Sequence, residues 1–538
     1  MKKQFSIFNF QFSIILLLFF VSTASLFAQA WQSKLVQMNS NGVLTYIPDQ
    51  TGNIIPNFSH AGYRGGDVAL PENIPVVKTL SPVAGDNTER IQAAINAIGE
   101  LPLQPTGYRG ALRLEAGIYE VQGMLRIAES GIVITGAGQG DDPAKNTIIR
   151  RTGSSRASVI QTGKNTRSRA FATEIANTRT FVTTPRVAVG SYELEVESAS
   201  AFRVGDAVLI VQPSTETWLE SVNFGDAFPE KTPNRTVWKA GEIDLRYHRY
   251  IKAINGNKIT FDAPVYDNLD RRLSQSYVAK FDDLDMVRNI GVENILVDIV
   301  TAGGESEDHA QDCIYFRRSE NCWARNVTTQ HFVHAGIQFG DGSMRGTVQN
   351  CRAIEPRGIP TGARFYNFGV QGAQLILFVN CYASDARHAF ISNGCSLDSG
   401  IVFLDCVCDG ALDTNEGHRR WAQALLYDNL VCKNPANGTA VKRAIGLYNR
   451  GNWGTAHGWG AVHSVAWNCM VPAEARIVIQ RPPGAQNYAI GCIGEVTDQG
   501  PFEAPVGYIE GDNKRGLEPR SLYQAQLKER TGRATGNN

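Results

Sequence analysis

The sequence predicts an all-β protein built as a parallel β-helix, and a repeat in its second half is the first observation that predicts it. Asparagine or aspartate followed by cysteine or an aliphatic residue recurs along this half. The repeat positions, separated by 24, 30, 25, 24, 39 and 23 residues, are Asn326, Asn350, Asn380, Asp405, Asn429, Asn468 and Gly491. A period near 24 residues suits a coil of three short strands and three turns. Asparagines of successive coils should then stack in a ladder, with the next residue pointing into the core.

The cysteines are the second observation. All ten lie between Cys313 and Cys492, and at least five follow the repeated position. In stacked coils that slot faces the core, where a free cysteine acts as a small hydrophobic residue. An exported protein with ten cysteines also invites disulfides, so one or two bridges between adjacent coils are the alternative. We favour core thiols, and without a CxxC motif we expect no metal binding by this set.

Short strand-like runs before the repeat are the third observation, and they help to divide the chain. A helix capped by residues 86–88 precedes several runs punctuated by glycine, asparagine or charged residues. Residues 192–261 instead alternate and contain an Asn255-Gly256 hairpin signal, typical of a small antiparallel subdomain. The predicted parts are an N-terminal extension (31–80), first coils with a capping helix (81–180), an inserted β subdomain (181–268), main coils (269–510) and a tail (511–538).

The N-terminus predicts export. Lys2 and Lys3 precede an apolar run ending at Phe20, and small residues surround Ala28 and Ala30. This pattern is typical of a cleavable signal peptide covering residues 1–30, and the short apolar run argues against a transmembrane anchor. We therefore expect a secreted or periplasmic monomer with no membrane anchor. The balance of 52 basic and 52 acidic residues gives no excess positive field, so we expect no nucleic-acid partner.

Three segments resemble the pectate lyase superfamily of right-handed parallel β-helix proteins. They are Gly85-Asp86-Asn87-Thr88 with the helix that follows, Leu114 to Tyr119, and Ile132 to Gly138. The resemblance covers most of residues 81–495 and implies the right-handed fold. The second segment has Glu115 where the family usually has proline. Members include polysaccharide lyases, hydrolases and non-catalytic proteins. The calcium and arginine motif of true pectate lyases and the aspartate motifs of polygalacturonases are absent, so neither activity transfers residue by residue.

Candidate site residues follow from an alignment of five strands, taken at Gly336–Gln338, Gly369–Gln371, Ala389–Ile391, Ala424–Leu426 and Gly446–Tyr448. If the middle residue faces inward, period two sends His334, Asn367 and Arg387 outward on adjacent coils. It also sends Gln338, Gln371 and Tyr448 outward on the next row. His388 then faces inward as a core histidine, although a register error of one residue reverses that prediction.

Two turn segments carry a dense set of basic and aromatic residues. One runs from Asp413 to Trp421, and the other from Asn449 to Trp459. A long loop of this composition is more often a binding wall than a solvated linker. Arginine forks suit carboxylates and tryptophan faces suit sugar rings, although Trp453 and Trp459 could instead pack the loop onto the coils. The predicted substrate-binding residues are His334, Asn367, Arg419, Arg420, Arg443, Arg450, Trp453 and His457.

The leading functional hypothesis is a polysaccharide lyase that cleaves a uronate-containing chain by β-elimination. Arg387, Arg419 and Arg450 would neutralise the uronate carboxylate. His418 or His388 would remove the adjacent C5 proton, and Tyr448 would protonate the leaving oxygen. The sequence assigns no definite cofactor. Ca²⁺ could assist at Glu305, Glu307, Asp308 and Asp312, but a solvated turn is the favoured interpretation of that stretch.

Two alternatives remain open at this stage. A glycoside hydrolase of an acidic plant or algal polysaccharide could use paired carboxylates drawn from Asp385, Asp413 and Glu416, about 6.5–9.5 Å apart in inverting chemistry. Glu416 could instead be an ion-pair partner that orients the basic residues after it. The third hypothesis is a non-catalytic β-helix protein that binds an acidic polysaccharide.

Overall fold

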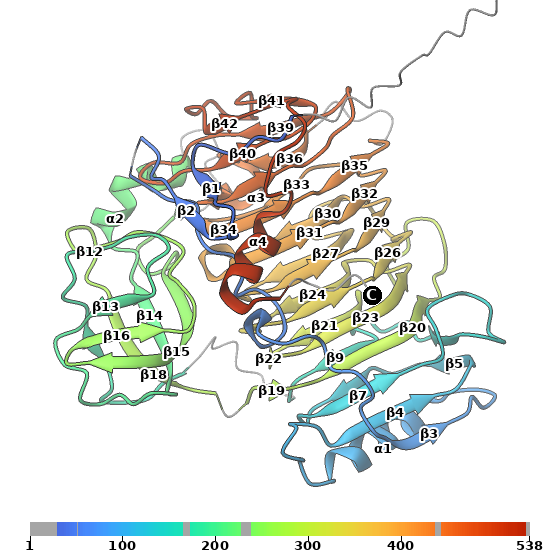
Figure 1. Ribbon diagram of the computed structural model, residues 1–538. Helices are drawn as coiled ribbons and strands as arrows, with labels where there is room; N and C mark the ends of the chain where they lie inside the picture. The colour runs from blue at the N-terminus through green and yellow to red at the C-terminus, as the bar shows by residue number, and fades with distance from the viewer. Residues whose placement is uncertain are drawn as a thin grey trace, which may run out of the picture.

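The computed structural model describes residues 29–50, 52–164, 173–227, 238–283, 285–435 and 443–533. All but the last two residues of the predicted signal peptide lie outside these ranges. The predicted parallel β-helix is confirmed: Figure 1 shows strands stacked in a column, with helix α1(Thr88–Gly99) beside its first coils and a β subdomain on one side. Consecutive coils pair in parallel through three ladders of strands.

The first and third ladders are the longest. The first contains β3(Val76–Leu80), β4(Gly110–Leu114), β7(Ile132–Thr135), β20(Gly291–Ile299), β23(Trp323–Gln330), β25(Thr347–Gln349), β28(Leu377–Val379), β31(Ser399–Leu404), β34(Ala422–Asp428), β37(Ala461–Val462), β38(Val465–Trp467), β40(Tyr488–Ile490) and β42(Tyr508–Glu510). The third contains β6(Leu125–Ile127), β9(Ile160–Thr162), β21(Asp312–Arg317), β24(Ala335–Gly340), β27(Tyr366–Gln371), β30(His388–Ser392), β33(Asn415–Gly417), β36(Arg443–Leu447), β39(Arg476–Ile479) and β41(Glu495–Thr497).

The second ladder lies between them. It contains β5(Gly117–Val121), β8(Thr147–Arg151), β26(Arg352–Ile354), β29(Tyr382–Ser384), β32(Val407–Asp409) and β35(Val431–Lys433), and the second halves of β20 and β23 join it. A short pair, β19(Val287–Arg288) and β22(Ser319–Glu320), precedes the first ladder.

The repeated asparagines form the corner between the first and second ladders. Each adopts a left-handed backbone, with φ of 52° at Asn326 and 55° at Asn350, which asparagine tolerates better than most residues. The Asn326 amide donates to Asn294 Oδ1 at 3.0 Å, and the Asn468 amide donates to Asn429 Oδ1 at 2.7 Å. The predicted asparagine ladder is therefore confirmed, and Asn294 extends it by one coil.

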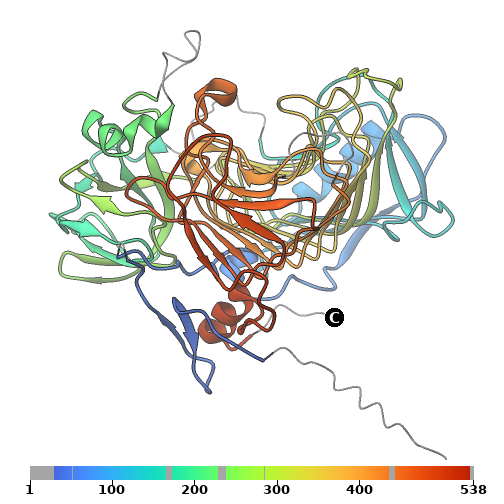
Figure 2. The same cartoon turned by 90° about the horizontal axis from the view of Figure 1, so that it is seen from above.

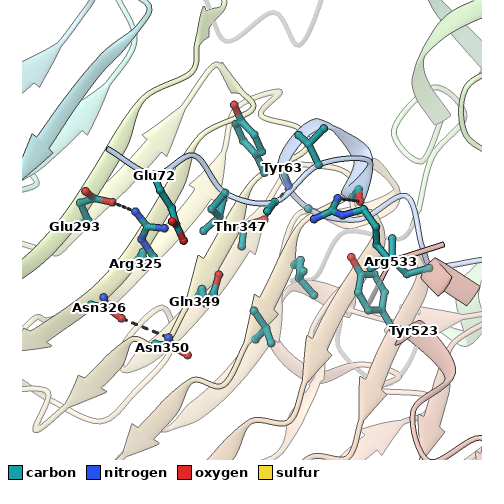
Figure 3. Close-up of a pocket in the computed structure, with 18 of the residues that line it drawn as sticks. Tyr63, Glu72, Glu293, Arg325, Asn326, Thr347, Gln349, Asn350, Tyr523 and Arg533 are labelled. Atoms are coloured by element: carbon teal, nitrogen blue, oxygen red, sulfur yellow. Dashed lines mark hydrogen bonds and ion pairs between the residues drawn. The ribbon is translucent and has the colours of Figure 1, made fainter. Parts of the chain in front are cut away.

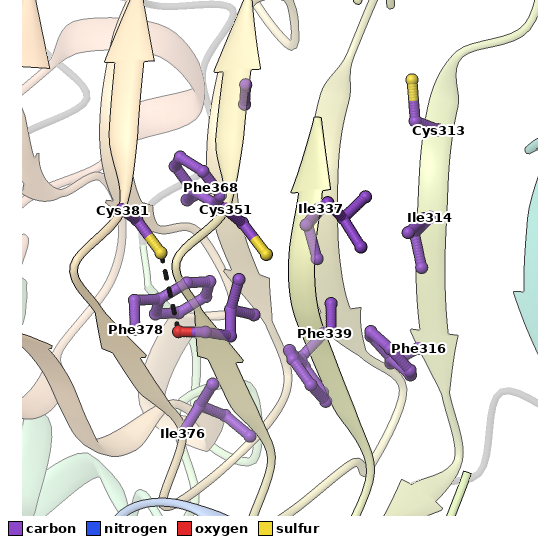
Figure 4. Close-up of a cluster of buried hydrophobic side chains, with 14 of the residues drawn as sticks. Cys313, Ile314, Phe316, Ile337, Phe339, Cys351, Phe368, Ile376, Phe378 and Cys381 are labelled. Atoms are coloured by element: carbon purple, nitrogen blue, oxygen red, sulfur yellow. Dashed lines mark hydrogen bonds between the residues drawn. The ribbon is translucent and has the colours of Figure 1, made fainter. Parts of the chain in front are cut away.

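The cysteines that follow the repeat lie in the core. Cys351, Cys381 and Cys406 are at most 1% exposed, and Figure 4 shows the first two among phenylalanine and isoleucine side chains. All ten cysteines belong to described residues and all are free thiols, so the disulfide alternative is wrong. Aromatic residues of neighbouring coils stack beside them, as Phe316 does on Phe339 with ring centroids 4.5 Å apart.

The inserted subdomain is an antiparallel sheet that spans residues 173–282. Its strands occur in the order β10-β18-β14-β15-β16-β13, and β11 also pairs with β18. The bounds are β10(Thr173–Glu174), β11(Thr180–Phe181), β13(Glu193–Glu195), β14(Ala207–Gln212), β15(Leu245–Asn255), β16(Lys258–Phe261) and β18(Tyr277–Asp282). The strands β12(Arg186–Val187) and β17(Leu269–Asp270) form a separate antiparallel pair. Helix α2(Glu216–Ser221) and the 3-10 helix η2(Asn223–Asp226) lie between β14 and β15.

The two ends of the chain meet beside the column. The hairpin β1(Val36–Met38)–β2(Leu44–Tyr46) lies against helix α4(Leu522–Thr531) in both views (Figures 1 and 2). The amide of Gln526 joins them by donating to Tyr46 Oη at 3.0 Å. The remaining short helices are η1(Tyr63–Gly66), η4(Cys395–Leu397) and α3(Trp453–Ala456). Within the described ranges, no helix is long and apolar enough to cross a membrane.

Candidate functional site

The outer face of the third ladder carries most of the predicted site residues. Strand register pairs Tyr366 with His388 and Phe368 with Phe390. The phenylalanines lie in the core, so alternation turns Glu416, which pairs with Ile391, outward. Since His418 follows Glu416 by two residues, it lies on the same face.

The predicted strand alignment is wrong at two points. Ala424–Leu426 belongs to β34 in the first ladder, and β33(Asn415–Gly417) takes its place in the third. In addition, Gln338 and Ile391 both pair with Gly369, so Gly336–Gln338 and Ala389–Ile391 are each displaced by two residues relative to Gly369–Gln371. The displacement preserves which residues point inward, because side chains alternate with a period of two.

Two residue orientations are also wrong. Asn367 was expected outward but is fully buried, and its amide donates to the carbonyls of Ala353 and Ser384 at 2.7 and 2.8 Å. It thus satisfies backbone acceptors at a corner of the coil. His388 was expected in the core, but it pairs with Tyr366 at the start of the outer row, and its ring contacts other site residues.

Aromatic and imidazole rings form a continuous cluster on this face. The ring centroids of His388 and His418 are 4.8 Å apart, and those of His418 and His457 are 4.9 Å apart. Tyr366 contacts His388 at 5.5 Å and His334 at 5.3 Å. These five residues are called the histidine cluster below. They come from four coils and the 449–459 loop, so only the fold brings them together.

Glu416 is the centre of the polar contacts. Its Oε1 lies 2.7 Å from His418 Nδ1 and 2.7 Å from Arg450 Nη1. Its Oε2 accepts a hydrogen bond from the Tyr448 hydroxyl at 2.5 Å. Arg450 also contacts His418 and donates to its carbonyl at 2.9 Å. Glu416 is fully buried, and such a carboxylate is stable there because three groups contact it.

The hydrogen bonds of the two histidines indicate which nitrogen can accept a proton. His388 Nδ1 lies 2.6 Å from the Thr414 carbonyl, so Nδ1 carries the hydrogen. Its Nε2 has no hydrogen-bond partner among the described residues and lies 3.8 Å from Asp413 Oδ2. In His418, Nδ1 turns to Glu416, which leaves Nε2 for the surface. The His418 side chain is 8% exposed, whereas that of His388 is fully buried.

The electrostatics keep these imidazoles neutral. Burial lowers the pKa of His388 below its usual value. Burial, together with the nearby Arg450 guanidinium, lowers the pKa of His418 further. Burial also raises the pKa of Tyr448 strongly, so its hydroxyl stays protonated. Although burial disfavours the charged form of Asp413, His388 and other neighbours hold the pKa of that carboxyl below its usual value.

The predicted binding residues lie around the cluster but differ in accessibility. Arg387 is 18% exposed, and its Nη2 lies 3.8 Å from Asp413 Oδ2. Arg419 donates to Asn393 Oδ1 at 2.9 Å, and Arg420 donates to the Thr455 carbonyl at 2.5 Å. These three arginines form the basic rim of the cluster. His334, at the far end, lies 2.7 Å from Asp312 Oδ1.

The 449–459 loop closes one side of the cluster. Trp453 is partly exposed, and the guanidiniums of Arg443 and Arg450 lie 5.2 and 5.5 Å from its ring centroid. Phe502 meets the same ring edge-on at 5.7 Å. Trp459 is fully buried. Both tryptophans therefore pack the loop, which is the alternative interpretation stated for them.

One group of side chains has the donor set of a metal site. Ligand atoms of His388, Glu416 and His418 lie within 4.8 Å of one another. However, the Arg450 guanidinium already contacts both Glu416 and His418, so a positive charge already lies next to the atoms that would bind a metal ion. These three side chains therefore fit the guanidinium of Arg450, and a metal ion would place a second positive charge beside it.

Two of the four acidic side chains considered for Ca²⁺, those of Glu307 and Asp312, form ion pairs. A hydrogen bond from Arg364 lowers the pKa of Glu307 to about 2, and Arg156 lies 3.0 Å from the same carboxylate. Asp312 contacts His334 and accepts from Ser158 at 2.9 Å. These two carboxylates are therefore engaged by other side chains.

A separate cleft lies on the outer face of the first ladder (Figure 3). It has a volume of about 530 Å³ and lies beneath the N-terminal segment near Tyr63 and Glu72. Arg325, on its wall, is paired with Glu293 at 2.6 Å. None of the predicted site residues lines this cleft, so we place the candidate chemistry at the histidine cluster, where His388 Nε2 and His457 Nδ1 have no hydrogen-bond partner among the described residues.

The sequence did not identify Tyr366 as a site residue. Alternation alone predicts the wrong face for it, because Tyr366 precedes the inward Phe368 by two residues. Alternation fails at this corner, because Asn367 and Phe368 are consecutive and both fully buried. His388 was named, but its outward position required the true register.

Comparisons with known proteins show remote structural likeness. No family model matches the sequence, and no curated protein matches it. The tailspike protein gp49 from Pseudomonas phage LKA1 is 13% identical with a TM-score of 0.43, covering 76% of this chain and 57% of that one. The alginate lyase from Paenibacillus sp. str. FPU-7 is 9% identical with a TM-score of 0.37, covering 81% and 100%.

The polygalacturonase from Erwinia carotovora ssp. carotovora is 10% identical with a TM-score of 0.36, covering 84% and 96%. This chain spans less than two thirds of the length of the tailspike it matches. These likenesses assign no reaction to the chain.

Proposed function

We propose that the protein is an exported polysaccharide lyase that cleaves a uronate-containing chain by β-elimination at the histidine cluster. The observation that carries the proposal is the contact between His418 Nδ1 and Glu416 Oε1 at 2.7 Å. When Nδ1 donates to this carboxylate, Nε2 is the unprotonated base. The substrate would be an acidic polysaccharide, bound by a monomer outside the cytoplasm.

His418 is the proposed base. Its lowered pKa keeps the imidazole neutral at neutral pH, and its partial exposure lets Nε2 meet a sugar ring. Removal of the C5 proton by Nε2 forms an imidazolium, which Glu416 stabilises. The electron pair of the broken C–H bond forms the C4–C5 double bond, and the C4–O bond breaks.

The basic rim is the proposed carboxylate site. Negative charge develops on the uronate carboxylate as the C5 proton leaves, and a guanidinium beside it stabilises that charge. Arg387 and Arg419 are partly exposed, so their side chains can reach a polymer. Arg450 is buried against Glu416, and it supports the base instead of the substrate.

Tyr366 is the proposed donor to the leaving oxygen, in place of Tyr448. The Tyr448 hydroxyl already donates to Glu416. The Tyr366 hydroxyl instead accepts hydrogen bonds from the Ala363 amide at 3.2 Å and from Arg387 at 3.5 Å. Its own proton therefore remains available for the departing oxygen.

The hydrolase alternative is less well supported. Asp413 and Glu416 approach opposite nitrogens of His388, at 3.8 and 3.6 Å. Glu416, however, is buried and contacts an arginine, an imidazole and a phenol, which leaves no oxygen to meet water or a glycosidic bond. Asp385, the third carboxylate considered, is exposed and accepts from Ser384.

The test follows ultraviolet absorbance and reducing ends together during incubation with polygalacturonate, alginate and other acidic polysaccharides. A lyase raises both signals, because the new double bond is conjugated with the carboxylate. H418A should abolish both signals, whereas H331A, at a histidine paired with Asp298 away from the cluster, should not. Reducing ends without absorbance would support the hydrolase, and binding without either signal would support the non-catalytic alternative.

A further inference from the structure

Two segments that carry the histidine cluster end on tryptophans that dock into the inserted subdomain. Trp421 follows His418 by three residues, and Trp459 follows His457 by two. Their indole rings are at most 2% exposed. Each indole N–H donates to a carboxylate of the inserted subdomain, so the two segments are held in the same way.

The contact at Trp421 is polar at one edge and aromatic around it. Its indole N–H donates to Asp267 Oδ2 at 2.6 Å. The rings of Trp218 and Trp238, both in the inserted subdomain, meet it edge-on with centroids 5.4 and 6.1 Å away. Edge-to-face aromatic contacts of this kind fix ring orientation as well as position.

The contact at Trp459 involves both side chain and backbone. The indole N–H donates to Asp226 Oδ2 at 2.7 Å, and the backbone amide donates to the Gly225 carbonyl at 3.1 Å. The indole N–H of Trp238 donates in return to the Ala456 carbonyl at 3.2 Å. At Gly458, a Cβ atom would lie 2.4 Å from the Gly225 oxygen, so the two chains approach as closely as backbone permits.

The loop transmits this anchoring to Arg450. The Arg450 amide donates to the Gly458 carbonyl at 2.8 Å, and the Gly458 amide donates to Gly451 at 2.9 Å. These bonds close the loop immediately next to Trp459. A displacement of Trp459 would therefore move Arg450, which contacts Glu416 and His418.

We propose that the inserted subdomain positions the cluster, with Asp226 and Asp267 as positioning residues that act through Trp459 and Trp421. Neither aspartate contacts the histidine cluster, and the histidine beside Asp267 is His463, whose Nε2 lies 3.2 Å from Asp267 Oδ1. Their effect would be to hold Arg450 and His418 close enough to Glu416 for both side chains to contact its carboxylate. The effect on turnover rests on the proposed lyase function, whereas the effect on loop order does not.

Hydrogen–deuterium exchange of the full chain tests the anchoring without any activity. W459F and D226A should accelerate exchange of the amides of residues 449–460 about tenfold or more, as expected for losing a buried hydrogen bond to a charged group. W467F is the matched control, because Trp467 is equally buried and donates at 3.0 Å to the Pro519 carbonyl elsewhere. Unchanged exchange of residues 449–460 in W459F, or equal acceleration there in W467F, would overturn the proposal.

Kinetics test the consequence for the site. D226A and W459F should lower kcat more than they raise KM, because the partly exposed arginines of the rim remain in place. D226N should recover most of the turnover, since its amide oxygen can still accept from the indole. A fall in kcat equal to that of W467F would make the contact merely structural. If the wild-type chain turns over no uronate polysaccharide, the proposed function fails, and the exchange result still decides the anchoring.

Discussion

His418 Nδ1 lies 2.7 Å from Glu416 Oε1, and the two residues are two positions apart in the sequence, at the end of β33. Side chains two apart in an extended chain point to the same face, so local sequence alone creates the contact. Arg450, which completes it, comes from the following coil.

Replacing Glu416 by glutamine should lower kcat about hundredfold, because a neutral amide stabilises an imidazolium poorly. KM should change little, since Glu416 is buried. Steady-state kinetics with the best substrate of the panel would measure this, with E355Q at a partly exposed glutamate as control. Turnover of E416Q at the wild-type rate would remove Glu416 from the mechanism.

Replacing Arg387 by alanine should raise KM about tenfold and lower kcat less, because the guanidinium is proposed to bind the uronate carboxylate. R387K should recover part of the affinity, as a point charge without the fork. The comparison requires initial rates over a range of substrate concentrations. A KM equal to that of the wild type would exclude Arg387 as a carboxylate ligand.

Stability should decrease as pH falls below about 6.5, in part through His388. Burial lowers the pKa of His388 in the folded state. The unfolded chain therefore binds this proton first on acidification, which favours unfolding. In H388N, an amide N–H can still donate to the Thr414 carbonyl but does not titrate. The difference in urea midpoint, variant minus wild type, should rise between pH 7 and pH 5, and a flat difference would contradict the assignment.

Asp428 should act in the opposite direction. Burial raises the pKa of this carboxyl from 3.8 to about 7. Between these values the unfolded chain loses the proton while the folded protein keeps it, so stability contributed by Asp428 is lost as pH rises. The urea midpoint of D428N relative to wild type should increase from pH 4 to pH 7 and then level off. A difference that decreases over this range would be inconsistent with a raised pKa.

The asparagine ladder should be sensitive to backbone conformation. N350A places alanine at φ 55°, and we expect a loss of about 1–2 kcal/mol in the free energy of unfolding. N350G should lose less, because glycine adopts this conformation freely. N96A, on the exposed face of α1, is the control and should be neutral or stabilising. Equal losses in N350A and N350G would mean that the side-chain ladder, and not φ, decides stability at this corner.

Much of the fold could be predicted because its determinants repeat. Each coil presents an asparagine at the same corner and a small core residue after it, so one local pattern occurs many times in the sequence. The register of the third ladder could not be predicted in the same way. Its strands lack a common marker, and a displacement of two residues preserves the hydrophobic pattern. Ala424–Leu426 was therefore taken for the strand that contains Glu416. Asn367 was taken for an outward residue for another reason: alternation fails where Asn367 and Phe368 follow each other and are both buried.

The sequence by itself determined the β-helix, the core thiols, the inserted subdomain and the pool of histidines and arginines from which the site is drawn. Only the tertiary structure decided that His388 faces outward, that Glu416 lies buried between Arg450 and His418, and that Trp421 and Trp459 dock on Asp267 and Asp226. The physical reason is the separation along the chain of the residues that interact. Periodicity and turn chemistry act within one coil, whereas these contacts join different coils or cross more than a hundred residues.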